Sequence, residues 1–358
     1  MTSSRNKKKR ISAVDLFCGA GGLTFGLNKA GIDVCVGVDL DKSCKYAYER
    51  NNKARFEPRS IADLTGAEVS SWFVPGTVRL LAGCAPCQPF SQHTRGRDTS
   101  TEPDWSLLDE FGRLVREVSP ELVTMENVTP IQHHEVFTRF VATLKQSGYK
   151  VAYGSIFCPD YGIPQERRRL VLMASRLGNV SLPKPTRTPK TYKSVKDTIS
   201  TLPKLAAGEI DPRDRLHLAR KLTPLNIKRL KASKPGGTWH DWPKELRSPC
   251  HQKESGSSFR SVYARMTWGD PSPTITTQFF NFGTGRFGHP EQDRSLTLRE
   301  GAMLQTFPKN YAFVPAGKPV IMRSLGKCIG NAVPPKLGEV IGKAFVAALP
   351  TPKKKNET

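Results

Sequence analysis

The chain has 358 residues, 37% of them hydrophobic and 24% charged, a composition typical of globular proteins. Its 55 Lys and Arg exceed its 32 Asp and Glu and give a formal net charge of +23, which favours a polyanionic partner. No apolar run reaches membrane-spanning length, no apolar segment follows the basic N-terminus as in a signal peptide, and the eight cysteines form neither a disulfide framework nor a zinc pattern. These exclusions predict a cytoplasmic protein with reduced thiols and no metal.

Residues 11–174 alternate short β-rich runs with helical patterns. This rhythm is typical of a doubly wound α/β fold with a mostly parallel sheet. The predicted strands are Ile11–Phe17, Asp33–Asp39, Arg79–Gly83, Glu121–Met125, Val151–Phe157 and Leu170–Ala174. The predicted helices are Leu23–Ala30, Lys42–Asn51, Ser106–Val118 and Glu135–Gln146.

A glycine-rich turn follows the first predicted strand, with Phe17, Gly19 and Gly21 in its sequence. Glycines let a backbone turn tightly and approach a ligand closely. Asp39 closes the second strand, where its carboxylate can accept hydrogen bonds from ribose hydroxyls. Thr24 stands where a dinucleotide-binding motif would have its third glycine. A glycine-rich turn without a ligand therefore stays open at this point.

The turn after strand 79–83 contains Cys84 and Cys87 in a C-x-x-C pattern. No second pair exists for zinc, and Pro89 argues against the helix of a thioredoxin-type redox motif. A cysteine at the carboxyl edge of a parallel sheet, near cationic groups, is placed to act as a nucleophile. An inert thiol is the alternative.

Charged side chains mark two further strands. Glu126 directly follows strand 121–125, where its side chain can reach the same pocket as Cys87. The alternative is that Glu126 only caps the next helix. Before strand 170–174, alternation along an extended segment places Arg167 and Arg169 on one face, which suits anion recognition. A plain surface charge run is the alternative for these arginines.

From about Ser181 the α/β rhythm stops and basic residues gather. Residues 183–262 contain 18 Lys and Arg against 7 Asp and Glu, a net of +11, as an electrostatic footprint on phosphates requires. We therefore predict a first domain at 1–180, a second at 181–325 and a C-terminal segment at 326–358, whose amphipathic helix 332–349 returns to the first domain. A solvated basic face remains the alternative for residues 183–262, and Trp239 and Trp242 are expected in the core.

Together these segments resemble the DNA (cytosine-5) methyltransferase family, of the bacterial restriction-modification or orphan type. The resemblance covers roughly residues 11–345 outside the basic region and rests on six motifs in the family's order. They are Asp15–Gly22, Pro86-Cys87-Gln88, Glu126-Asn127-Val128, Gln165-x-Arg167-x-Arg169, Leu298–Pro308 and Gly330–Pro335.

The resemblance implies an S-adenosylmethionine-dependent methyltransferase fold with a smaller target-recognition domain. It implies methyl transfer from S-adenosyl-L-methionine to carbon 5 of a cytosine in a specific double-stranded DNA sequence, after base flipping. Cys87 would form a covalent adduct with the base, supported by Glu126, Arg167 and Arg169. The implied cofactor contacts are Phe17, Gly19, Gly21, Asp39, Leu40, Asp63, Pro86 and Asn331. We further expect a monomer associated with the nucleoid, with any cognate restriction endonuclease acting separately.

Two departures from the family are mild. The family often has Gly or Pro where Cys84 and Ala85 stand, so we expect Cys84 to be structural, and Asp39 replaces the Glu of many members.

Two other functions remain open. A transfer-RNA cytosine-5 methyltransferase would use the same chemistry, but such relatives lack a large recognition insert and carry a Cys-Phe-Thr segment absent here. A non-catalytic DNA-binding regulator on the same fold is disfavoured because Cys87, Glu126 and Arg169 are retained.

Overall fold

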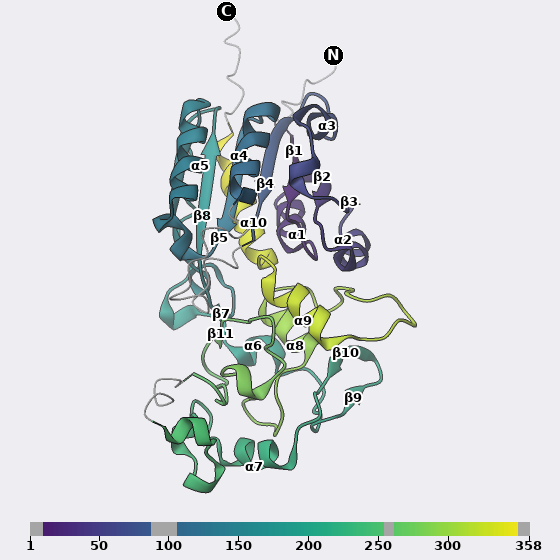
Figure 1. Ribbon diagram of the computed structural model, residues 1–358, viewed down its shortest axis with the longest axis vertical. Coiled ribbons are helices and arrows are strands. Elements are labelled where there is room, and N and C mark those ends of the chain that lie inside the picture. Colours follow the sequence, from purple (N-terminus) through teal and green to yellow (C-terminus); the bar gives the residue numbers. More distant parts are fainter. Residues whose placement is uncertain (1–9, 87–105, 254–260, 350–358) are drawn as a thin grey trace, which may run out of the picture. The chain divides into compact units, whose positions relative to one another are not determined.

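The computed structural model describes residues 10–86, 106–253 and 261–349. The chain divides into two compact units (Figure 1). Unit 1 combines residues 1–156, 168–184 and 335–358, and unit 2 combines residues 157–167 and 185–334. The chain thus enters unit 2 first at residue 157, returns to unit 1 for residues 168–184, and leaves unit 2 for the last time after residue 334. None of the described helices is long and apolar enough to cross a membrane.

Unit 1 is built on a seven-stranded sheet with the order β3-β2-β1-β4-β5-β8-β6. Pairing is parallel from β3 through β5, and β8 runs antiparallel to β5. The mostly parallel, doubly wound sheet predicted from the sequence is confirmed. The strands are β1 Ile11–Leu16, β2 Asp33–Val38, β3 Arg55–Glu57, β4 Val78–Gly83, β5 Leu122–Asn127, β6 Lys150–Phe157 and β8 Arg168–Ser175.

The helices of unit 1 form two packed groups (Figure 1). In one group α4 packs against α3 and α5, over a core cluster that includes Val14, Leu16 and Phe111. In the other group α1 packs against α10 so closely that a Cβ at Gly26 would lie 2.1 Å from the carbonyl oxygen of Pro335. These helices are α1 Gly22–Lys29, α2 Lys45–Asn51, α3 Gly66–Ser71, α4 Ser106–Val118, α5 Glu135–Gln146 and α10 Pro335–Ala348.

Unit 2 consists of short elements joined by long irregular segments. Its paired strands form two small ladders, β9 with β10 and β7 with β11. The strands are β7 Gln165–Glu166, β9 Ile210–Asp211, β10 Asp214–Leu218 and β11 Ser272–Pro273. The helices are α6 Val195–Ile199, α7 Pro224–Ala232, α8 Leu298–Leu304 and α9 Met322–Asn331. With so little regular structure, packing and side-chain hydrogen bonds must hold the unit together.

Aromatic side chains form a hydrophobic cluster in unit 2. Trp239 and Trp242 are 2% and 1% exposed and share a cluster with Phe282. The indole of Trp242 donates to Ser233 Oγ at 2.8 Å, so its polar nitrogen is satisfied inside the core. The core role predicted for both tryptophans is confirmed.

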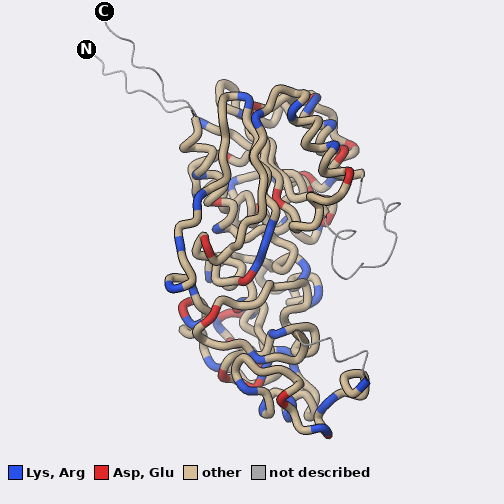
Figure 2. The backbone as a smooth tube through the Cα atoms, turned by 90° about the vertical axis from the view of Figure 1, so that its left-hand side faces the viewer, with Lys and Arg blue, Asp and Glu red and all other residues tan. Residues whose placement is uncertain are grey.

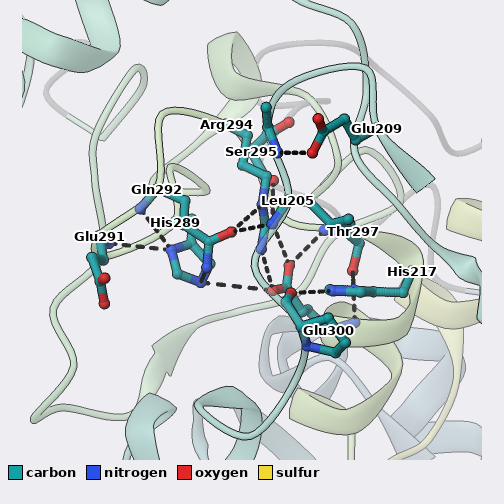
Figure 3. Close-up of polar contacts among 12 residues, drawn as sticks. Leu205, Glu209, His217, His289, Glu291, Gln292, Arg294, Ser295, Thr297 and Glu300 are labelled. Carbon is teal, nitrogen blue, oxygen red and sulfur yellow. Dashed lines mark hydrogen bonds and ion pairs between the residues drawn. The ribbon is translucent and has the colours of Figure 1, made fainter. Parts of the chain in front are cut away.

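A polar network forms a second cluster in unit 2 (Figure 3). Both terminal nitrogens of the Arg294 guanidinium donate to Glu300, at 2.8 and 2.7 Å. Glu300 also accepts from the backbone nitrogen of Thr297 at 2.8 Å and so caps α8, while Thr297 Oγ1 contacts His217 Nδ1 at 3.0 Å. The network therefore connects the start of α8 to His217 of β10. It also connects α8 to Arg294, in the segment that precedes this helix.

Candidate active site

The loops that carry the predicted motifs begin side by side. Leu16 of β1 is in register with Gly83 of β4, which is in register with Met125 of β5. The backbone nitrogen of Cys84 also donates to the carbonyl oxygen of Leu16 at 3.2 Å. The glycine-rich turn, the cysteine-bearing turn and Glu126 therefore all leave the carboxyl edge of one sheet, where ligands bind in such folds.

The glycine-rich turn adopts left-handed backbone conformations. Phe17, Gly19 and Gly21 have φ angles of 59°, 50° and 88°. A Cβ at Gly19 would meet no heavy atom within 4 Å, so the turn is open there. Asp39 follows β2, and its Oδ2 accepts from the backbone nitrogen of Gly19 at 2.8 Å. Asp39 is thus tied to the glycine-rich turn, and its predicted hydrogen bonds with ribose hydroxyls stay a prediction.

A buried carboxylate lies under this turn. Asp15 is 1% exposed, and its Oδ2 accepts from Thr24 Oγ1 at 2.6 Å. Its Oδ1 accepts no hydrogen bond within the described part of the chain. Burial, against the opposing hydrogen bond from Thr24, raises the pKa of Asp15 to about 7. Sequence reasoning gave Asp15 no role of its own, although its place at the end of β1 was a usable signal.

The remaining predicted cofactor residues have varied surroundings. Leu40 is 70% exposed, a high value for a large apolar side chain. Asp63 is exposed at the end of a short turn of helix, and Pro86 is half-buried. Asn331 is exposed at the end of α9 and belongs to unit 2, so its participation in the same site stays a prediction.

Glu126 is the central buried charge of this edge, at 3% exposure. Its Oε2 accepts a hydrogen bond from the Cys84 thiol at 3.0 Å. Its Oε1 lies 3.2 Å from Arg169 Nε, an ion pair without hydrogen-bond geometry. Oε1 therefore accepts no hydrogen bond from the described residues, although a buried carboxylate oxygen is normally satisfied.

The cysteine-bearing turn is tied to β5 through its main chain. Asn127 Nδ2 donates to the carbonyl oxygen of Ala85 at 3.1 Å, and Asn127 Oδ1 accepts from the backbone nitrogen of Val128 at 2.8 Å. Sequence reasoning assigned no separate role to Asn127 and expected Cys84 to be structural. Cys87, the predicted nucleophile, lies outside the described residues.

Arg167 and Arg169 have different partners within their own units. Arg169 belongs to unit 1 and contacts Glu126. Arg167 belongs to unit 2, is 2% exposed, and donates to the carbonyl oxygens of Ile275 at 3.2 Å and Gly330 at 3.4 Å. It lies between β7, which ends at Glu166, and β8, which begins at Arg168. The shared face of the two arginines stays a prediction.

The basic residues predicted to contact phosphates are in unit 2. Figure 2 shows the distribution of Lys and Arg along the backbone. Lys228, Lys231 and Lys234 are exposed in and just after α7. Arg229 is instead 8% exposed and packs its guanidinium 5.4 Å from the ring centres of both Trp242 and Tyr263, so it is structural. The described residues contain no group of three or more His, Cys, Asp or Glu side chains arranged for a metal.

A doubly wound sheet with an open glycine turn and a buried carboxylate at its carboxyl edge defines an α/β enzyme that binds a nucleoside-type cofactor. The sequence matches the family model of C-5 cytosine-specific DNA methylases over residues 11–347. It is 48% identical to the type II methylase M.HgiDII of Herpetosiphon aurantiacus, over 93% of this chain and 94% of that protein. It is 31% identical to the type II methyltransferase M1.HphI of Haemophilus parahaemolyticus, over 94% and 87%.

The fold has solved counterparts. A putative DNA modification methyltransferase of an E. coli prophage superposes with a TM-score of 0.70 at 20% identity, covering 94% of this chain and 98% of that one. The S. pombe Dnmt2 methyltransferase gives a TM-score of 0.58 at 16% identity, covering 95% and 98%. The chain belongs to the C-5 cytosine-specific DNA methylase family. The expected activity, S-adenosylmethionine-dependent methylation of carbon 5 of cytosine in DNA, is confirmed at this level.

Proposed function

We propose that the enzyme methylates a cytosine within a specific duplex sequence, after extruding the base, through a covalent adduct with Cys87. The observation that supports this most directly is Glu126 Oε1, a buried carboxylate oxygen that accepts no hydrogen bond at the ligand edge of the sheet. A base that donates a hydrogen bond there would satisfy it. Extrusion costs a few kcal/mol, which such pocket contacts offset.

The chemistry needs activation of the ring, because carbon 5 of cytosine is a poor nucleophile. The Cys87 thiolate adds to carbon 6, and the electrons of the 5,6 double bond become available at carbon 5. Glu126 supports protonation at ring nitrogen 3, and Arg169 holds the Glu126 carboxylate at 3.2 Å. After methyl transfer to carbon 5, a base removes the carbon 5 proton and the bond to Cys87 breaks. We assign Arg167 a positioning role, because it binds main-chain carbonyls.

The glycine-rich turn has features that fit S-adenosylmethionine. Open space at Gly19, the Asp39 carboxylate for ribose hydroxyls and the exposed Leu40 side chain for an apolar surface suit a nucleoside. The unsatisfied Oδ1 of Asp15 is a buried acceptor that would suit the ammonium group of S-adenosylmethionine. When bound, S-adenosylmethionine supplies a methyl group activated by a sulfonium. Phe17, Gly21, Asp63, Pro86 and Asn331 complete the proposed contacts.

Unit 2 is the proposed target-recognition region. Its cations would grip phosphates, while a few polar side chains would read base edges in the major groove. The relatives named type II methyltransferases suggest a role beside a restriction endonuclease that acts separately. We propose a monomer that works on the nucleoid in the cytoplasm.

Incubation with labelled S-adenosylmethionine and genomic DNA free of 5-methylcytosine tests the proposal. The expected product after nuclease digestion is 5-methyldeoxycytidine, and sequencing of the treated DNA gives the target. Cys87→Ser should lose methylation but retain DNA binding, because the hydroxyl is a far weaker nucleophile at neutral pH. Transfer RNA serves as the competing substrate. Substantial turnover by Cys87→Ser, or preferred methylation of transfer RNA, contradicts the proposal.

A further inference from the structure

Cys84 is a side chain of the active-site edge to which the chemistry above gives no part. It follows β4 and precedes the predicted nucleophile by three positions. In this chain the Cys84 thiol donates to Glu126 Oε2 at 3.0 Å. A thiol is a weak donor, but its acceptor here is a buried carboxylate, which strengthens the contact.

The contact divides the two oxygens of Glu126 between different partners. Oε2 is held by the thiol, and Oε1 faces Arg169 Nε at 3.2 Å without a hydrogen bond. A carboxylate held at one oxygen cannot rotate freely about its terminal torsion. We infer that Cys84 is a positioning residue for methyl transfer: its thiol holds Oε2 of Glu126, so that Oε1 is the oxygen left to meet the extruded cytosine. This inference rests on the proposed function.

The turn does not depend on the thiol for its own position. The backbone nitrogen of Cys84 donates to the Leu16 carbonyl oxygen at 3.2 Å, and the Ala85 carbonyl oxygen accepts from Asn127 at 3.1 Å. Both contacts use main-chain groups of the turn, so neither depends on the residue 84 thiol. Loss of the thiol therefore acts on the Glu126 carboxylate while the path of the chain is kept.

Two variants remove the donor and one retains a donor. Cys84→Ala and Cys84→Gly leave Oε2 of Glu126 without its partner, whereas Cys84→Ser supplies a hydroxyl of similar size. Cys35→Ala is the matched control, because Cys35 is also half-buried in unit 1 and its thiol donates to a main-chain carbonyl oxygen, that of Asp33, at 3.6 Å. All four are made in the full chain and compared with the wild type for thermal unfolding.

The assay is steady-state methyl transfer from labelled S-adenosylmethionine to genomic DNA free of 5-methylcytosine. We expect Cys84→Ala and Cys84→Gly to lower kcat about tenfold, the effect of one hydrogen bond to a charged group. KM for both substrates should stay within about twofold, because the lost contact acts in the chemical step. Cys84→Ser and Cys35→Ala should retain kcat within about twofold of the wild type.

The outcomes separate the inference from the proposed function. A wild-type protein without cytosine methylation refutes the proposed function, and the inference falls with it. An active wild type with an unchanged kcat in both donor-free variants overturns the inference alone. Equal loss in Cys84→Ser and Cys84→Ala also overturns it, because a retained donor at residue 84 would then not preserve methyl transfer. A loss confined to KM, or explained by unfolding at the assay temperature, has the same consequence.

Discussion

Arg294 and Glu300 form a two-pronged ion pair in which both side chains are almost fully buried, at 0% and 1% exposure. The pair lies in unit 2, where regular structure is sparse. Glu300 also caps α8 through Thr297, and Arg294 donates to the carbonyl oxygen of Ser295 at 3.0 Å. The pair thus organises the segment that leads into α8, the helix of one of the family motifs.

Removal of one partner should destabilise the protein strongly. Glu300→Ala leaves Arg294 as an uncompensated buried charge, and we expect a loss of about 3–5 kcal/mol in the free energy of unfolding. Glu291→Ala is the control, because Glu291 forms an exposed ion pair with Lys204, and its loss should matter little. Urea unfolding followed by fluorescence measures both. Similar midpoints for Glu300→Ala and the wild type would contradict this role.

His289 should make stability depend on pH. Burial, against the opposing charge of Glu300, lowers its pKa from 6.5 to about 4. Between these values the unfolded chain binds a proton that the folded protein does not, so stability is full above pH 6.5 and falls as pH falls toward 4. The expected loss is about 3 kcal/mol. The geometry agrees, since His289 Nδ1 accepts from the backbone nitrogens of Glu291 and Gln292 at 3.1 and 3.0 Å and must be unprotonated.

His289→Gln tests this assignment. In that variant the free energy of unfolding should change less between pH 6.5 and pH 4 than in the wild type, with the exposed His240→Gln as control. Below pH 4.5 both proteins should lose further stability, because the charge of Arg294 overcomes burial and lowers the pKa of Glu300 to about 2. If the free energy of unfolding changes equally with pH above 4.5 in the wild type and in His289→Gln, His289 does not contribute to this pH dependence.

Gly19 offers a test of the cofactor site. Gly19 and Gly31 both have positive φ angles, 50° and 86°, and in both cases a Cβ would meet no heavy atom within 4 Å. Valine at either position therefore strains the backbone by a similar amount, about 1–2 kcal/mol. Only at Gly19 would the side chain fill the space proposed for the cofactor. We expect Gly19→Val to weaken S-adenosylmethionine binding at least about tenfold in calorimetry, and Gly31→Val to retain it. Equal affinities of the two variants would remove this turn from the site.

The strong periodic patterns of the sequence predicted most helices and strands of unit 1, but not β3 or α3. Helices 106–118 and 135–146 were predicted with their observed bounds, because a continuous apolar stripe at helical spacing has few alternatives. The C-terminal helix begins at Pro335 and not at the predicted residue 332, since proline suits the first turn. Strand β3 was missed because its three residues, Arg55–Glu57, are too few to show alternation.

For the site, the sequence predicted which side chains stand at the ends of strands, but not the contacts between these side chains. The position of Glu126 at the end of β5 follows from the order of elements, but its contact with Cys84 depends on the register of β4 against β5, which no local pattern fixes. The surroundings of Arg167 were also beyond the reach of a local pattern. The chain passes between units at this point, and contacts with the distant residues Ile275 and Gly330 bury its guanidinium.

DNA binding should weaken steeply with salt, and exposed cations of unit 2 should carry part of that dependence. A footprint on about six phosphates lowers affinity about a thousandfold between roughly 50 and 200 mM salt. The triple change of Lys228, Lys231 and Lys234 to Gln should weaken binding to unrelated duplexes alike and reduce the salt slope by up to about 0.9 for each cation on a phosphate.

The matched control for this variant is the triple change of Lys53, Lys145 and Lys150 to Gln, which removes three exposed cations from unit 1. Both triple variants lose the same net charge, so a general effect of charge on association would lower the two affinities equally. Loss of direct phosphate contacts would change the dependence of affinity on salt, and only in the unit 2 variant. For each contact that is lost, binding releases one counterion fewer. Equal slopes in both variants and the wild type would place the phosphate contacts elsewhere in the chain.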